Sequence, residues 1–102
     1  MAGGTPHNAI SSGRKTADAA IKASSGKLHG ATLEVAAADG IIIIYDNATA
    51  ASGDILDKIM IDVSLEGNDR TKHVPYPAPL SFSNGVYVDV TGTGAAYIIH
   101  YE

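Results

Sequence analysis

The chain of 102 residues contains no cysteine and no tryptophan, and it has one phenylalanine and five tyrosines. Without cysteine, neither a disulfide nor a thiolate metal site can stabilise the fold, and no thiol nucleophile is available. Large aromatic side chains dominate core burial in most proteins, so their scarcity predicts a thin core for a single copy. We therefore expect part of the stability to come from self-association or from docking on a partner.

Long apolar runs are also missing. The longest run, residues 41–45, is far shorter than the roughly 20 residues that span a bilayer. Residues 1–10 lack the apolar centre of a signal peptide. We therefore expect a soluble protein with no membrane partner.

Positive charge is scarce and unevenly placed. The formal net charge is −4, which argues against non-specific nucleic-acid binding because that requires a cluster of cations facing the phosphates. The segment up to residue 27 nevertheless carries four cations against the single acid Asp18, whereas three cations face ten acids in the rest of the chain. We take these four cations as candidate partner-binding residues: Arg14, Lys15, Lys22 and Lys27.

Small residues fill the first part of the chain. Glycine, serine, threonine and alanine interrupt any hydrophobic period over residues 1–20, which predicts an extended N-terminal arm. Residues 14–22 could form a short helix, but their one large apolar side chain is Ile21, so an arm or an edge strand is favoured. Residues 21–102 then form a second unit with strand-length patterns.

The first of these patterns is a strand over residues 28–35. It leads to Asp39-Gly40, a dipeptide typical of a tight hairpin turn. Residues 41–45 follow with four consecutive isoleucines, which favour a central strand buried on both faces. Residues 46–53 are small and turn-forming, and they predict a loop.

The next strand is predicted by alternation. Ile59, Ile61 and Val63 alternate with Met60 and polar residues, which favours a strand over a helix, and residues 66–69 then read as a turn.

The last part of the chain contains three prolines at residues 75–79, which exclude an interior strand and predict an edge or a crossover. Asn84-Gly85 predicts a hairpin, residues 92–94 predict another turn, and residues 96–101 form the closing strand. About seven short strands separated by turns indicate an all-β fold, a single β-sandwich or jelly-roll-like domain.

Reactive side chains form no recognisable motif. The oxygen-rich loop at residues 46–54 is a candidate for Ca²⁺, but alanines separate its oxygen donors and the EF-hand pattern is absent. The histidines are scattered, with no two at metal-ligand spacing: His7, His29, His73 and His100. We predict no catalytic residue, no metal site and no cofactor, and therefore a protein that is not an enzyme.

Several short stretches resemble small structural proteins of tailed bacteriophages. The resemblance covers residues 21–102 and is carried by turn and strand patterns: Gly26-Lys27-Leu28-His29-Gly30, Ile43-Ile44-Tyr45-Asp46, Thr49-Ala50-Ala51-Ser52-Gly53, the stretch from Pro79 through Asn84-Gly85 to Val88, Gly92-Thr93-Gly94-Ala95 and the terminal Tyr101. This chain departs from the pattern by an insertion at residues 66–78. The resemblance assigns no individual site residue.

Such proteins are often decoration, or cement, proteins on the outer surface of the capsid, commonly trimers. The resemblance therefore implies a virion protein that stabilises the shell, binds the major capsid protein, forms a homo-oligomer, most simply a trimer, and resides in the host cytoplasm during assembly. Two alternatives stay open. One is a host-recognition or glycan-binding module on a fibre, and the other is a head-tail adaptor.

Overall fold

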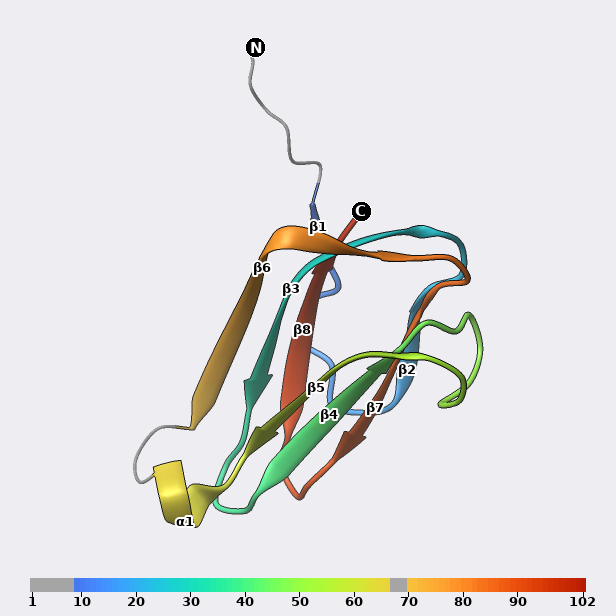
Figure 1. Ribbon diagram of the computed structural model, residues 1–102. Helices are drawn as coiled ribbons and strands as arrows, with labels where there is room; N and C mark the ends of the chain where they lie inside the picture. Colours follow the sequence, from blue (N-terminus) through green and yellow to red (C-terminus); the bar gives the residue numbers. More distant parts are fainter. Residues whose placement is uncertain (1–8, 67–69) are drawn as a thin grey trace.

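The computed structural model describes residues 9–66 and 70–102, and it is built almost entirely of β-strands (Figure 1). A single helical turn, α1, interrupts them. The elements in chain order are β1 (Ile10–Ser11), β2 (Ala19–Lys22), β3 (Gly26–Glu34), β4 (Gly40–Tyr45), β5 (Ile55–Ile61), α1 (Val63–Glu66), β6 (Thr71–Phe82), β7 (Val86–Thr91) and β8 (Ala96–Tyr101).

The strands form two antiparallel four-stranded sheets. Sheet A has the order β1-β8-β3-β6, and sheet B has the order β2-β7-β4-β5. The first strand thus pairs with the last, the second with the seventh, the third with the sixth and the fourth with the fifth. This pairing is a long antiparallel ribbon rolled into two sheets, which is a jelly roll. The predicted all-β sandwich is confirmed.

The expected N-terminal arm contributes an edge strand to each sheet. In β1, Ile10 lies opposite Tyr101 of β8, and Lys15 makes two backbone hydrogen bonds with Tyr97, at 2.8 and 2.9 Å. The segment then crosses to sheet B, where β2 pairs with β7. The predicted boundary between residues 20 and 21 falls inside β2, and residues 1–8 of the arm lie outside the described part of the chain.

The core lies between the two sheets and is mainly aliphatic. Its largest fully buried side chain is Tyr97, whose hydroxyl donates a 2.7 Å hydrogen bond to the carbonyl of Ala17. Burial, and secondarily the nearby Asp18 and Tyr87, raise the pKa of Tyr97 to about 12. The buried residues of the core cluster are Leu28, Ala31, Leu33, Val35, Ile42, Ile44, Ile59, Ile61, Phe82, Val86, Val88, Ala95, Tyr97 and Ile99.

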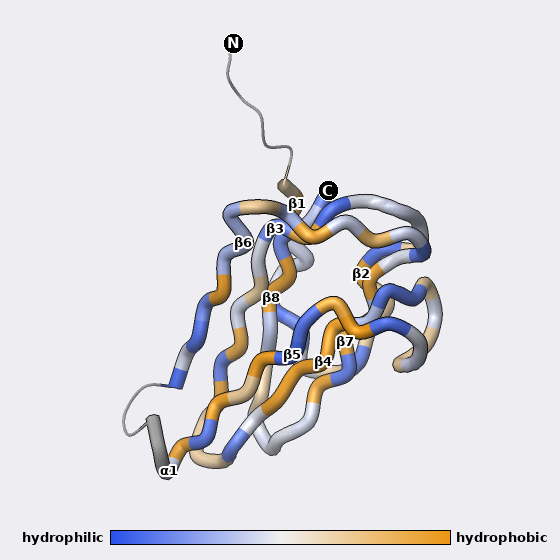
Figure 2. Tube along the Cα trace, in the orientation of Figure 1, coloured by the Kyte–Doolittle hydropathy of each residue, from blue (hydrophilic) through white to orange (hydrophobic). Residues whose placement is uncertain are grey.

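Strand β4 is an interior strand of sheet B, but the prediction that both its faces are buried is wrong. Ile42 and Ile44 are fully buried, whereas Ile41, Ile43 and Tyr45 are only half-buried on the opposite face. Successive side chains of a strand point to opposite faces, and an antiparallel sandwich covers only one face of each sheet. Strand β4 is therefore hydrophobic along its length in Figure 2, although its isoleucines alternate between the core and the surface.

Both dipeptides predicted to form hairpins connect different sheets instead. Asp39-Gly40 lies between β3 of sheet A and β4 of sheet B, and Asn84-Gly85 lies between β6 and β7. At Gly40, a Cβ atom would lie 2.4 Å from Cγ1 of Val35, so glycine is needed for close packing of the crossover. The hairpin between sequential strands is β4–β5, across the loop predicted at residues 46–53.

The proline-rich strand β6 lies at the edge of sheet A, as predicted. Gly30 of β3 pairs with Pro75, whereas Leu28, only two residues away, pairs with Leu80. The intervening part of β6 therefore bulges out of the regular pairing. Prolines are tolerated there because an edge strand needs ladder donors on one side only.

The strand predicted to reach Val63 ends at Ile61, and α1 follows it. The carboxylate of Asp62 accepts a 3.0 Å hydrogen bond from the N–H of Ser64, and Asp39 accepts one of 2.9 Å from the N–H of Val63. Both acids satisfy backbone donors at the start of the turn, which favours helix over strand. Of the turn predicted at residues 66–69, only residue 66 is described.

Candidate functional site

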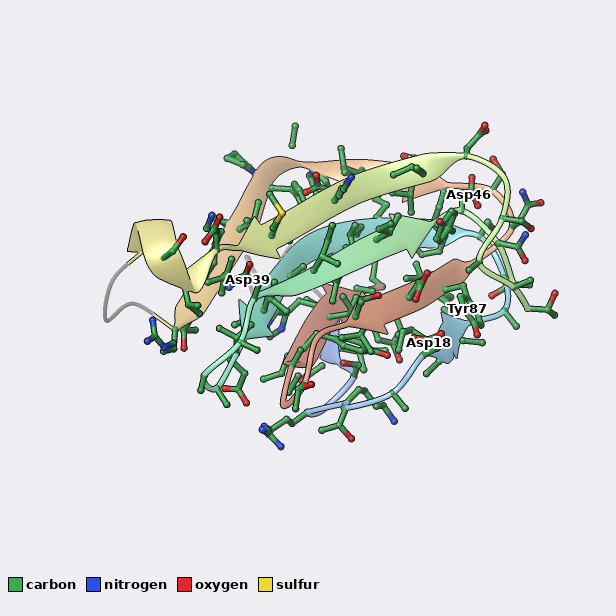
Figure 3. The ribbon with its side chains drawn as sticks, turned by 90° about the horizontal axis from the view of Figure 1, so that it is seen from below. Asp18, Asp39, Asp46 and Tyr87 are labelled. Atoms are coloured by element: carbon green, nitrogen blue, oxygen red, sulfur yellow. The ribbon has the colours of Figure 1, made fainter. Side chains whose placement is uncertain are left out.

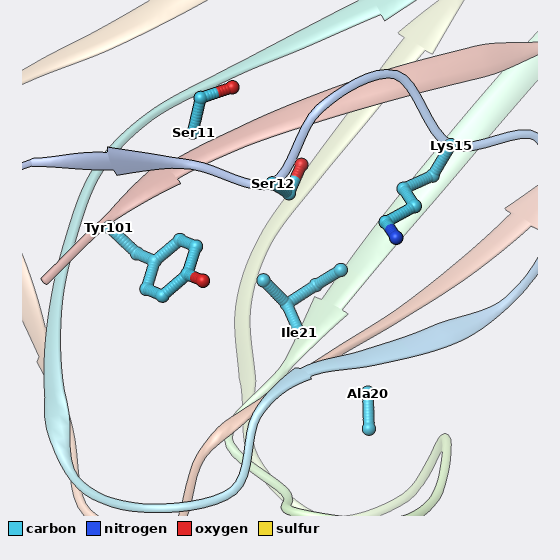
Figure 4. Close-up of a pocket in the computed structure, with 6 residues that line it drawn as sticks. All are labelled: Ser11, Ser12, Lys15, Ala20, Ile21 and Tyr101. Atoms are coloured by element: carbon cyan, nitrogen blue, oxygen red, sulfur yellow. The ribbon is translucent and has the colours of Figure 1, made fainter.

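The candidate partner-binding cations occupy separate surroundings. Arg14, in the segment between β1 and β2, forms an ion pair with Glu34 of β3 on the outer side of sheet A. Lys15 lines a hollow of about 130 Å³ where this segment passes from sheet A to sheet B. Figure 4 shows Lys15 and the ring of Tyr101 on opposite sides of this hollow.

Both serines of this hollow make hydrogen bonds with the protein backbone. The hydroxyl of Ser12 accepts a 2.8 Å hydrogen bond from the N–H of Ile99 and donates one of 2.8 Å to the carbonyl of Gly13. The hydroxyl of Ser11 accepts one of 3.0 Å from the N–H of Gly13. These contacts fix the segment on β8, so the hollow results mainly from the packing of this segment against the sheets.

The other two cations lie near the opposite end of β2. The ammonium of Lys22 is 5.9 Å from the ring centroid of Phe82, a cation–π contact. Lys27 is exposed at the start of β3, and its backbone makes two hydrogen bonds with Glu102, at 3.0 and 2.9 Å. The structure therefore does not gather the four cations into one patch.

The oxygen-rich loop at residues 46–54 is organised by its own hydrogen bonds. The side-chain oxygen of Asn47 accepts the N–H groups of Thr49 and Ala50, at 2.9 and 3.0 Å, and its amide nitrogen donates to the carbonyl of Ser52 at 3.1 Å. These oxygens are engaged in a turn. Among the described residues, no group of three or more His, Cys, Asp or Glu side chains could hold a metal ion.

Asp46, the first residue of that loop, ties it to the β6–β7 connection. Its carboxylate accepts the N–H groups of Ser83, Asn84 and Gly85 at 3.0, 2.8 and 3.3 Å. Partial burial raises the pKa of Asp46, but the three backbone donors outweigh it and hold the pKa below its ordinary value. Figure 3 shows Asp46 and Asp39 at the two ends of β4, where each fixes a distant connection.

The outer face of sheet A is mainly polar. The hydroxyl of Thr32 and Nδ1 of His73 lie 2.7 Å apart, and the rings of His73 and His100 meet edge to face with centroids 6.0 Å apart. Nε2 of His29 lies 2.8 Å from Oε1 of Glu102. No sequence pattern predicts that His73 and His100 meet, because they lie on different strands and become neighbours only through β3.

The outer face of sheet B is mainly apolar, which the sequence patterns did not predict. Ile55 and Met60 of β5 are 55% and 56% exposed, and among the described elements of sheet A it is mainly β3 and β6 that contact sheet B, on its inner side. We call this surface the B face. It consists of Ala20, Ile41, Ile43, Tyr45, Ile55, Lys58, Met60, Tyr87, Asp89 and Thr91.

The register arranges the B face in three rows across β5, β4 and β7. Met60, Ile41 and Thr91 form the first row. The second row is Lys58, Ile43 and Asp89, and the third is Ile55, Tyr45 and Tyr87. An apolar stripe along β4 is thus flanked by one cation on β5 and one acid on β7.

The acid on β7 is one of a pair. Asp18, in the segment that leads into β2, accepts a 2.8 Å hydrogen bond from the N–H of Val90 of β7 (Figure 3). Burial, followed by the charge and hydrogen bonding of Asp18, raises the pKa of Asp89 above its ordinary value. Lys58 lies across two strand spacings, about 10 Å from Asp89.

The first row also contains an apolar depression. It has a volume of about 170 Å³ and is lined by Asp39, Gly40, Ile41, Met60 and Thr91. Gly40 and Thr91 leave room that larger side chains would fill, while Ile41 and Met60 supply its apolar wall.

Comparison with known proteins found no match: no family model, no curated protein and no solved structure matches the chain. No helix in the described part of the chain is long and apolar enough to cross a membrane.

Proposed function

We propose that this protein is a non-enzymatic structural protein that decorates and stabilises the capsid of a tailed bacteriophage. The observation that carries the proposal is the B face, a sheet surface with six large apolar or aromatic side chains on a chain with few aromatic residues. Surfaces of this kind mark contacts between proteins. Jelly rolls occur in viral capsid proteins and also in lectins, so the fold is compatible with this role without deciding it.

The proposed partner is the major capsid protein, on the outer surface of the virion. The four N-terminal cations are the candidate contacts, because exposed Lys15 and Lys27 can approach an acidic shell without losing a partner seen in the described chain. Arg14 and Lys22 would have to exchange their contacts with Glu34 and Phe82.

Co-sedimentation with shells of the major capsid protein encoded in the same genome tests the proposal. We expect saturable retention of the full chain on the shell. Replacement of Arg14, Lys15, Lys22 and Lys27 by serine should weaken retention, more at low salt than at high salt, because exposed charges are screened over about 8–10 Å. Absence of retention on shells at any salt concentration would contradict the proposal.

Two other functions would give different retention. Tyr45 and Tyr87 lie directly opposite one another on the B face, and paired aromatic rings could stack on a sugar, as in a fibre module that binds host polysaccharide. Retention on polysaccharide rather than on shells would favour that function. Retention on portal or tail structures would favour a head-tail adaptor.

The number of copies is a separate question. The resemblance to decoration proteins predicts a trimer. If one face instead joins two copies about a two-fold axis, the number of copies is even. The mass of the isolated protein in solution distinguishes a trimer from an even number of copies.

A further inference from the structure

We infer that the B face is the contact between two copies of this chain, which pack sheet to sheet about a two-fold axis parallel to β4. The inference is independent of whether the resulting pair sits on a capsid. It follows from how charge and shape are distributed over the three rows.

A two-fold contact uses the same surface on both copies, so residue i meets residue j and residue j meets residue i. When two sheets pack face to face, the axis lies in the plane between them. If it runs along β4, each position on β5 meets the position of the same row on β7 of the other copy. Residues of β4 then meet their own equivalents.

The charged row selects this axis. With the axis along β4, Lys58 of each copy meets Asp89 of the other, and two equivalent ion pairs form. With the axis across the strands, Lys58 would meet Lys58 and Asp89 would meet Asp89, which is repulsive. Lys58 makes no ion pair through its ammonium within the described residues, and Asp89 lies beside a second acid, Asp18, so both gain an opposite charge in the pair.

The apolar rows match under the same axis. Met60, one of the two exposed large apolar residues of β5, meets the row position of Thr91 beside the 170 Å³ depression of the other copy. Ile55 meets Tyr87, and Ile43 meets its own equivalent at the axis. The protruding side chain thus lies against the depression, and the apolar stripe of β4 is covered.

The size of the B face limits the strength of the contact. Six residues of β4 extend about 20 Å, and four strands span about 14 Å from first to last. This is small for a specific interface, which covers about 800 Å² on each partner. We therefore expect reversible pairing with a dissociation constant on the order of micromolar.

Charge reversal tests the inference with the full chain. Lys58→Glu places a third acid beside Asp89 and Asp18 of the other copy, and Asp89→Lys places two cations together. Because each change acts twice in a symmetric pair, sedimentation velocity should detect at least about tenfold weaker pairing for either single variant. The double variant Lys58→Glu/Asp89→Lys should pair again.

A mixture of the two single variants gives the sharpest result. Each variant alone should be mainly monomeric near the dissociation constant of the unchanged chain, whereas an equimolar mixture should form mixed pairs, because both contacts then join opposite charges. Ser81→Glu, which adds a negative charge at an exposed position of sheet A, is the control and should pair like the unchanged chain. A trimeric or monomeric unchanged chain at high micromolar concentration, or a failure of the mixture to pair, would overturn the inference. Circular dichroism of each variant verifies that it is folded.

Discussion

The two sheets have the same number of strands and the same antiparallel pairing, but their outer faces differ in chemistry. The outer face of sheet A presents polar side chains: Thr32, His73, His100 and Glu34, which forms an ion pair with Arg14. The B face presents a stripe of isoleucine and tyrosine along β4, flanked by exposed Ile55 and Met60. The difference is therefore not imposed by the fold.

This difference separates residues needed to fold one copy from residues available for contact. Ile42 and Ile44 are fully buried between the sheets, whereas Ile41 and Ile43 on the same strand are half-buried on the outside. A solvated face requires no further partner, while contiguous apolar area on a soluble protein marks a contact surface. Substitutions that compare adjacent residues, or equivalent residues on the two sheets, can test this separation.

The largest effect should come from comparing Ile42→Asp with Ile43→Asp. Aspartate at residue 42 would place an unpaired charge between the sheets, so we expect a loss of about 4 kcal/mol or more in the free energy of unfolding. Aspartate at residue 43 would remain hydrated in a single copy and should cost about 1 kcal/mol through strand propensity. Urea denaturation at concentrations below the pairing range measures both. Equal losses would show that residue 43 is part of the core.

The second comparison concerns association. Ile43→Asp brings two carboxylates together at the two-fold axis and should weaken pairing by about a hundredfold or more. Ile98→Asp is the matched control, because Ile98 is a half-buried, outward-facing isoleucine on the interior strand β8 of sheet A. It should leave the dissociation constant unchanged. If both variants pair equally well in sedimentation equilibrium, the two faces do not differ in function.

A smaller effect is expected at the edge of the B face. Met60→Ala removes the side chain that meets the depression, and pairing should weaken about tenfold because each pair loses two such contacts. Ile10→Ala is its control, since Ile10 is 54% exposed on β1 of sheet A. Isothermal dilution calorimetry measures both dissociation constants. A stronger effect for Ile10→Ala would place the contact on sheet A.

The smallest effect concerns fold stability alone. Asp46→Asn removes the charge that accepts three backbone N–H groups, at a cost of about 1–2 kcal/mol in the free energy of unfolding. Because the pKa of Asp46 is lowered on folding, its contribution is complete above its ordinary value of 3.8 and is lost as pH falls through the lowered pKa. The difference in unfolding free energy between the two chains should therefore shrink as pH falls below 3.8, and pairing at neutral pH should not change. A difference that does not decrease as pH falls below 3.8 would contradict this account of Asp46.

Local patterns in the sequence predicted the strands better than their connections. Alternation at Ile59 and Ile61 identified β5, and the prolines of β6 identified an edge strand. Asn84-Gly85 and Asp39-Gly40 favour a reversal of the chain, but their local chemistry does not specify whether the next strand joins the same sheet. Here the next strand joins the other sheet in both cases. Asp46 accepts N–H groups of the β6–β7 connection, and Gly40 packs closely in the β3–β4 connection, so contacts distant in the sequence hold each crossing.

The B face could not be predicted because its central strand, β4, has an unbroken apolar sequence. Four consecutive isoleucines carry no alternation, so residues 41–45 alone do not indicate which side faces the core. The neighbouring strands do carry that information, since Lys58 and Asp89 both lie opposite Ile43. Their register, however, depends on long-range pairing that the sequence does not specify.

The most direct test of the central claim is zero-length cross-linking in an equimolar mixture of ordinary and ¹⁵N-labelled chains. A carbodiimide joins an amine to a carboxylate that it touches, and mass spectrometry identifies which copies supplied each. We predict Lys58–Asp89 cross-links, about half of them between a labelled and an unlabelled chain, because random pairing of two copies gives that proportion. Lys58–Asp89 cross-links found only within chains of one label, or mixed cross-links that join other residues instead, would contradict the claim that the B face holds a second copy.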